Sequence, residues 1–256
     1  MQPHERVTAA IRAANDAGRT ALVPFITAGY PDPGRFVADL CEVAAVGDVV
    51  EIGIPFSDPM ADGMTIQRSS FEALKKGVSL KWIFAELDAA GGIGAPLVMM
   101  SYLNPLLQFG YEALARRAAA AGVCAFIVPD LPYEESDDLR RALEAEGLGL
   151  VQLVTPATPA ARLAKLAAAS RGFVYAVTVT GITGGGTGLP ADLAGYLDRV
   201  ADVATLPVCA GFGIRSAADV ASVGEHAAGA IVGSALVEVL EKGESASQFL
   251  ERLLAR

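Results

Sequence analysis

Short apolar segments bounded by glycine, proline or aspartate recur along the chain. Eight of them have the character of strands: 21–29, 48–55, 96–104, 122–130, 148–156, 172–181, 206–214 and 229–236. Their apolar residues run continuously instead of alternating with polar ones, which is typical of strands buried on both faces of a parallel sheet. Alanine- and leucine-rich segments with helical spacing lie between them, for example 111–122, 134–147, 161–171 and 216–229.

Eight such strands alternating with helices place the chain in the α/β class. They favour a closed (β/α)8 TIM barrel over an open doubly wound sheet. Extra helical segments are predicted before the first strand, at 2–16, and after the last, at 246–255. No linker, low-complexity tract or break in composition divides the chain, so residues 1–256 are expected to form a single TIM-barrel catalytic domain.

Two connections between strands are irregular. The connection after the second strand is the longest: Asp48 and Pro96 begin successive strands, and the distance in sequence between them exceeds that between any other two successive strand starts. Long connections at the carboxyl ends of barrel strands are candidates for the active site. The other, 178–190, carries the glycines 181, 184, 185, 186 and 188 and is predicted to be a mobile lid. A surface loop without a role is the alternative.

Composition excludes several classes of protein. Apolar residues make up 52% of the chain, which excludes disorder. The net charge of −9 argues against nucleic acid or an anionic membrane as a partner. The amino terminus is polar and amphipathic, unlike a signal peptide, and the apolar stretch 118–129 is shorter than the roughly 20 residues of a membrane span. A cytoplasmic protein is therefore predicted.

The cysteines and histidines offer no catalytic or metal-binding pattern. Cys41, Cys124 and Cys209 are widely spaced in apolar contexts and are predicted to be buried reduced thiols. No Cys/His cluster has the spacing of a metal site, and neither His4 nor His226 has a partner at motif spacing. No metal site is predicted.

Two acids after or within the second strand are candidates for chemistry. Glu51 lies between Val50 and Ile52, where burial should raise its pKa toward neutrality and suit it to give and take a proton. A structural carboxylate that caps a neighbouring loop is the alternative. Asp62 follows in the long connection, where an ionised carboxylate could accept a hydrogen bond from a substrate N–H. Position alone favours a turn or N-cap role for Asp62, because it precedes glycine.

Glycines near the last two strands predict an anion site. Gly211 and Gly213 follow the seventh strand, and Gly233 and Ser234 follow the eighth, each pair ahead of a predicted helix. Backbone N–H groups and a helix N-terminus at these positions favour phosphate. No G-x-G-x-x-G turn is present, so a phosphorylated small molecule is expected and not a dinucleotide.

The segment VEIGIPFSDPMADG (50–63), with TIQ at 65–67, closely resembles the signature of the tryptophan synthase alpha chain family. The resemblance extends over nearly the whole chain. It includes PFITAGYPD (24–32), YLNP (102–105), VPDLPYEES (128–136), TPATP (155–159), VTGITG (179–184), GFGI (211–214) and GSALVE (233–238).

The resemblance implies a lyase of L-tryptophan biosynthesis that cleaves indole-3-glycerol phosphate to indole and glyceraldehyde 3-phosphate by a retro-aldol route. It implies no cofactor or metal in this chain. Glu51 matches the general acid/base, and Asp62 matches the carboxylate that holds the indole N–H. The residues that match substrate-binding positions are Phe25, Tyr175, Thr183, Gly184, Phe212, Gly213, Gly233 and Ser234.

The family also implies a partner. Its members form an α₂β₂ complex with a beta chain that carries pyridoxal phosphate (PLP) and receives indole through an internal tunnel. Asp58, Pro59 and Asn104 match positions on that interface. Two alternatives stay open: a free-standing indole-releasing lyase, and a catalytically silent subunit that only binds a beta chain. The presence of both Glu51 and Asp62 counts against the silent subunit.

Two departures from the family pattern concern loop rigidity. Met64 stands where a proline is expected, and the lid reads TGGGTG where many members carry a bulkier or charged residue. Extra glycines raise the entropy lost on closure. Our hypothesis is that the isolated chain has an open lid and depends strongly on its partner; equal rates with and without a beta chain would contradict it.

Overall fold

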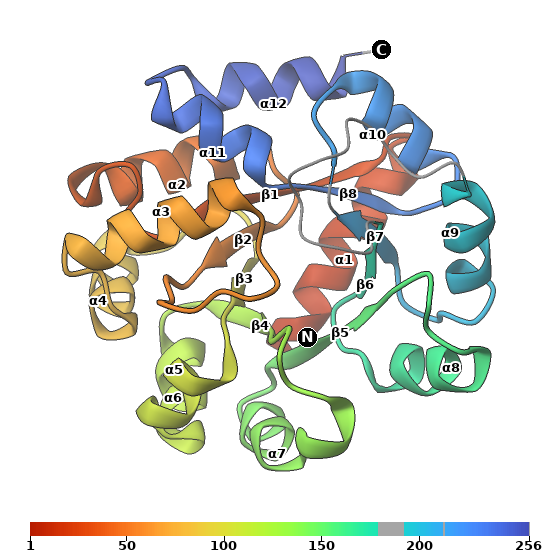
Figure 1. Cartoon of the computed structure of the whole chain (residues 1–256), viewed down its shortest axis with the longest axis horizontal. Coiled ribbons are helices and arrows are strands. Elements are labelled where there is room, and N and C mark those ends of the chain that lie inside the picture. Colours follow the sequence, from red (N-terminus) through yellow and green to blue (C-terminus); the bar gives the residue numbers. More distant parts are fainter. Residues whose placement is uncertain (179–191, 212, 256) are drawn as a thin grey trace.

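The computed structural model describes residues 1–178, 192–211 and 213–255. Eight parallel strands form a closed barrel in the order β1 to β8, with β8 paired to β1 (Figure 1). The strands are β1 (Ala21–Thr27), β2 (Val50–Gly53), β3 (Leu97–Met100), β4 (Val123–Ile127), β5 (Gly149–Val154), β6 (Val174–Val177), β7 (Val208–Gly211) and β8 (Gly229–Val232). The prediction of a TIM barrel is confirmed, and each strand lies inside its predicted segment.

Helices surround the barrel (Figure 1). They are α1 (Pro3–Asp16), α2 (Phe36–Ala44), α3 (Met64–Lys75), α4 (Leu80–Ala90), α5 (Leu103–Phe109), α6 (Tyr111–Ala120), α7 (Asp137–Ala145), α8 (Ala160–Ala169), α9 (Leu193–Ala201), α10 (Ala217–Gly224), α11 (Ser234–Glu241) and α12 (Ala246–Leu254). Two short 3-10 turns, η1 (Pro33–Arg35) and η2 (Tyr133–Glu135), precede α2 and α7. Among the described residues, no helix is long and apolar enough to cross a membrane.

The two terminal helices predicted from the sequence are present as α1 and α12. Helix α1 packs against both β1 and β4, so it crosses one end of the barrel (Figure 1). Its buried residues Val7, Ile11 and Ala14 belong to the same apolar cluster as inward-facing strand residues such as Val23 and Ile231. Helix α1 therefore closes the amino-terminal end of the barrel and leaves the carboxyl end for a site.

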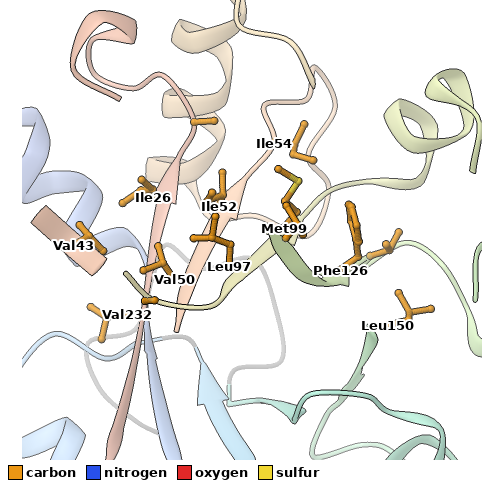
Figure 2. Close-up of a cluster of buried hydrophobic side chains, with 14 of the residues drawn as sticks. Ile26, Val43, Val50, Ile52, Ile54, Leu97, Met99, Phe126, Leu150 and Val232 are labelled. Atoms are coloured by element: carbon orange, nitrogen blue, oxygen red, sulfur yellow. The ribbon is translucent and has the colours of Figure 1, made fainter. Parts of the chain in front are cut away.

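A second, larger apolar cluster fills the layer between the strands and the helices. Figure 2 shows part of it, including Ile26, Val50, Ile52 and Leu97. Successive side chains of a strand point to opposite faces. Because Val50 and Ile52 belong to this outer layer, Glu51 between them points into the barrel.

The long connection after β2 contains an additional helix. Residues 54–63 form the loop, α3 follows it, and α4 is the helix that leads to β3. Gly63 is the N-cap of α3 and Met64 its first residue, 65% exposed. Proline is common at that first helical position because its missing N–H would have no helical partner there. The loop after β2 therefore ends at Gly63 and is shorter than the sequence indicated.

The prediction that all three cysteines are buried is wrong for one of them. Cys124 and Cys209 are buried, but Cys41 on α2 is exposed. Helix α2 turns Phe36, Leu40 and Val43 toward the core, and Cys41 lies next to Leu40 on the solvent side. All three are free thiols.

Candidate functional site

Glu51 lies in β2 with its side chain inside the barrel, 1% exposed. Its Oε2 atom is buried and has no hydrogen-bond partner among the described residues. Burial, and to a smaller extent the charge of Asp62, raise the pKa of Glu51 to about 8. The Oε2 atom therefore caps no loop among the described residues, and the catalytic role of Glu51 stays a prediction.

Asp62 is buried at the end of the loop 54–63, 8% exposed. Burial raises the pKa of Asp62 to about 6, and a hydrogen bond with the Tyr102 hydroxyl opposes that rise. The same hydroxyl accepts a hydrogen bond from the Ala61 N–H at 2.8 Å. Gly63 and not Asp62 is the N-cap of α3, so the N-cap alternative is excluded. The Asp62 N–H donates a hydrogen bond to the Pro59 carbonyl at 3.2 Å, which is compatible with the turn alternative.

The two acids differ in protonation near neutral pH. With pKa values of about 8 and about 6, Glu51 is mostly protonated at pH 7 and Asp62 mostly ionised. A site with one neutral and one ionised carboxyl group can donate a proton and hold a positive charge at the same time.

Aromatic rings line the barrel beside the acids. Phe25 in β1 is the register partner of Glu51, and it is buried. Tyr175 in β6 is also buried; burial first, and then the charges of Glu51 and Asp62, raise its pKa well above the ordinary tyrosine value. The family resemblance implied substrate-binding positions for Phe25 and Tyr175, and the structure places both near the acids.

Two glycines make room for these rings. A Cβ atom on Gly53 would lie 2.3 Å from Cζ of Phe25, and one on Gly211 would lie 2.3 Å from the Tyr175 hydroxyl oxygen. Real Cβ atoms do not approach other atoms so closely. Both positions therefore require glycine while the rings keep their places.

The anion-binding prediction concerns the ends of β7 and β8. Gly213 has φ +85°, a conformation that favours glycine, and Gly233 is the N-cap of α11, whose first residue is Ser234. No described side chain caps α11, whereas the N-terminus of α10 is closed by a capping box between Ser216 and Asp219. The N–H groups at the start of α11 are thus the ones available for an anion, and Gly233 lies beside Phe25.

Not every predicted residue can be placed. Thr183, Gly184 and Phe212, and the predicted lid at 178–190 apart from its first residue, lie outside the described residues. The predicted interface residues are at the surface: Asp58 and Asn104 are exposed, and Pro59 is partly exposed. The histidines bond elsewhere, His4 Nδ1 with the Gly147 carbonyl and His226 Nδ1 with Asp198.

Within the part of the chain that the structure describes, no group of three or more His, Cys, Asp or Glu side chains could hold a metal ion. The two buried acids of the candidate site are Glu51 and Asp62, and Glu51 is mostly protonated at neutral pH.

Tyr102 is a site residue that was not predicted from the sequence, although it begins the YLNP segment. Tyr102 is 4% exposed and its ring stacks on Phe56, with centroids 5.1 Å apart. Its contact with Asp62 depends on how the loop 54–63 folds over β3, which no local pattern shows. Gly53 and Gly211 were missed as spacers for the same reason.

Comparisons with known proteins agree on one family. A family model described as "Tryptophan synthase alpha chain" matches residues 11–256. The tryptophan synthase alpha chain of Desulfovibrio desulfuricans is 48% identical over 246 residues, covering 94% of this chain and 96% of the relative. That of Laribacter hongkongensis is 44% identical over 257 residues, covering 98% and 96%.

Solved structures give the same result. Tryptophan synthase from Mycobacterium tuberculosis in an aminoacrylate-bound form aligns with a TM-score of 0.88 at 35% identity, covering 98% of both chains. Tryptophan synthase subunit alpha from Legionella pneumophila aligns with a TM-score of 0.87 at 30% identity, covering 99% of this chain and 97% of the other. This chain therefore belongs to the tryptophan synthase alpha chain family.

Proposed function

We propose that this chain is the lyase subunit that cleaves indole-3-glycerol phosphate to indole and glyceraldehyde 3-phosphate. The observation that carries the proposal is Glu51, a fully buried carboxyl group with an unpartnered oxygen, next to a second buried acid. The aromatic walls of Phe25 and Tyr175 fit an indole ring, and the uncapped start of α11 fits a phosphate.

In the first step, protonated Glu51 transfers its proton to the indole carbon that carries the glycerol phosphate side chain. The ring becomes a cation with its charge shared by the ring nitrogen. Ionised Asp62 accepts the N–H hydrogen bond and stabilises that charge. The pKa values of about 8 and about 6 provide these two protonation states at neutral pH.

In the second step, the Glu51 carboxylate accepts the proton of the side-chain hydroxyl on the adjacent carbon. The carbon–carbon bond breaks, and its electron pair returns to the ring and restores indole. The hydroxyl oxygen becomes the aldehyde oxygen of glyceraldehyde 3-phosphate. Glu51 ends protonated, so the cycle needs no outside acid or base, and no cofactor or metal in this chain.

The proposal includes a partner. We infer that a beta chain carrying PLP binds this subunit in an α₂β₂ complex in the cytoplasm and receives the indole by channelling. Support comes from the exposed Asp58 and Asn104 and from large apolar side chains near them in the chain. Met60 is 75% exposed, Met64 65% and Leu107 55%. Exposed apolar side chains gathered in neighbouring segments are typical of protein interaction sites.

The deciding experiment measures cleavage of indole-3-glycerol phosphate by the wild type and by Glu51→Gln, each with and without a beta chain. Glu51→Gln keeps the volume of the side chain and removes the transferable proton. We expect its kcat to fall by at least about 10²-fold, the lower end for loss of general acid–base catalysis. A variant that kept most of its activity would rule out Glu51 as the acid/base.

The same assay separates the alternatives. A free-standing lyase would give the same wild-type rate with and without the beta chain. A silent subunit would give no cleavage in either case, although it would bind the beta chain. The lyase subunit proposed here gives cleavage that the beta chain stimulates.

A further inference from the structure

Two carboxylates of α11 contact α3. Glu238 accepts a hydrogen bond from the Thr65 hydroxyl at 3.3 Å and also pairs with Arg215 in the segment after β7. Glu241 accepts hydrogen bonds from the Arg68 guanidinium at 2.7 and 2.8 Å and from the Tyr30 hydroxyl at 2.5 Å. We call the Thr65–Glu238 and Arg68–Glu241 contacts the two cross-links.

The cross-links have matching spacing on both helices. Thr65 and Arg68 are three residues apart on α3, and Glu238 and Glu241 are three residues apart on α11. Residues at that spacing lie on the same face of a helix. Two bonds between the same two faces fix the relative rotation and translation of the helices, which one bond alone would not.

Each of these helices begins at one end of the candidate site. Helix α11 starts at Ser234, directly after Gly233, where the anion site is predicted. Helix α3 starts at Met64, two residues after Asp62. The Gln67 side chain on α3 donates a hydrogen bond to the Asp62 carbonyl at 2.8 Å, so the place of α3 determines the place of Asp62.

The cross-links contribute little to stability. The Arg68 and Glu241 side chains are 52% and 21% exposed, and exposed ion pairs contribute about 0–1 kcal/mol. Helix α3 is also held on the barrel by a buried hydrogen bond between Ser69 and Thr27, at 2.6 Å. Variants without the cross-links should therefore still fold. The property that the cross-links control is then the spacing of the two helices.

We propose that Thr65, Arg68, Glu238 and Glu241 are positioning residues that set the distance between the anion site and Asp62. This inference rests on the proposed function. A substrate that carries phosphate at one end and an N–H at the other gains from both contacts only if their spacing is right. The cross-links should therefore affect the reaction of the intact substrate, and not the binding of molecules that occupy only the anion site or only the site at Asp62.

The test compares the intact substrate with its two halves. The variant is Thr65→Val/Arg68→Gln, and the measurements are kcat/KM for indole-3-glycerol phosphate, the inhibition constant of glycerol 3-phosphate and the Kd of indole. We expect kcat/KM to fall about tenfold, within the roughly hundredfold loss that a 1 Å misplacement causes. We expect both half-ligand constants to change less than twofold. Thr65→Val/Arg68→Lys, which keeps the charge at position 68, should recover part of the loss relative to Thr65→Val/Arg68→Gln.

Lys75→Gln is the matched control. Lys75 is on the same helix and carries the same charge, but it pairs with Glu72 of α3 itself, at 2.9 Å. It should leave all three constants within twofold. The inference is overturned if the double variant keeps the wild-type kcat/KM, or if the half-ligand constants weaken as much as kcat/KM does. Absence of cleavage by the wild type would instead overturn the proposed function, and this inference with it.

Discussion

At the scale of single residues, Glu51 is a carboxyl group that is costly to bury. Its Oε2 atom has no hydrogen-bond partner among the described residues, so the ionised form destabilises the folded chain. Its pKa of about 8 is the consequence, since the folded chain avoids the charge by keeping the proton. The same property that suits Glu51 to proton transfer therefore lowers stability at high pH.

Glu51→Gln should stabilise the protein, and more so as the pH rises. The folded pKa of Glu51 is about 8 and the unfolded value about 4.5, so the folded state binds more protons between these values and loses stability as pH increases. Glutamine does not ionise. Denaturant unfolding at pH 5 and at pH 7.5 should show a gain that is larger at pH 7.5, by on the order of 3 kcal/mol. An equal gain at both pH values would contradict the raised pKa.

Tyr102→Phe should shift the acid side of the pH–rate profile. The Tyr102 hydroxyl lowers the pKa of Asp62, so its removal should raise that pKa and move the acid limb of kcat/KM to higher pH. The phenylalanine ring keeps the stacking on Phe56. The control is Tyr196→Phe, whose hydroxyl donates to the Val154 carbonyl at 2.8 Å. If the acid limb moved equally in both variants, the shift would come from loss of a buried hydroxyl in general and not from loss of the hydrogen bond to Asp62.

The sequence predicted the site residues unevenly, for physical reasons. Glu51 was identifiable because a carboxylate among apolar neighbours is costly to bury. Asp62 was ambiguous because position alone favoured a turn or N-cap role for an aspartate before glycine, and its burial beside Glu51 is not visible in the sequence. The YLNP segment did not mark Tyr102 as a site residue, since its contacts with Ala61 and Asp62 join segments from two different connections.

At the scale of elements, all eight strands were predictable, whereas helix α3 was not. The continuous apolar runs that mark buried parallel strands are local in sequence, so all eight strands were found. Helix α3 was missed because its first turn, MTIQ, lies directly after a motif of prolines and glycines that resembles loop. The position of one helix against another, as between α3 and α11, depends on side chains distant in sequence and is not readable locally.

Gly211→Ala should disturb the barrel end of β7. The added Cβ would lie 2.3 Å from the Tyr175 hydroxyl oxygen, so the buried ring must move. Such overpacking costs about 1–3 kcal/mol, which should lower Tm by several degrees. Displacement of Tyr175 should also lower kcat/KM.

Thermal unfolding and the cleavage assay check this prediction, with Gly94→Ala as the control. A Cβ atom on Gly94 would have no atom within 4 Å, so that variant should match the wild type in both measurements. A Gly211→Ala chain as stable and active as the wild type would mean that Tyr175 does not line the pocket.

At the scale of the whole molecule, the two ends of the barrel have different tasks. Helix α1 closes the amino-terminal end with apolar side chains, while the acids, the aromatic rings and the start of α11 gather toward the other end. The loop 54–63 contains both the buried Asp62 and the exposed Asp58, which are four residues apart in sequence. A partner that bound at Asp58, as we propose, would be connected to the site through one short segment.

The double variant Asp58→Ala/Asn104→Ala should lose stimulation by the beta chain while the rate of the isolated chain stays the same. Both side chains are exposed and neither contacts Glu51 or Asp62 in the contacts described. Titration of cleavage rate with beta chain measures the effect. Asp202→Ala, an exposed aspartate after α9 at the opposite end of the barrel, is the control. Stimulation that survives in the double variant would place the interface elsewhere.

The exposure of Cys41 has a practical consequence. The other two thiols are buried, and burial raises both of their pKa values, which disfavours the reactive thiolate. A maleimide dye should therefore attach to the native chain at one position, on the outside of α2 and away from the barrel interior. The chain can therefore be labelled at a single site without mutation, and its assembly with a partner can be followed by fluorescence.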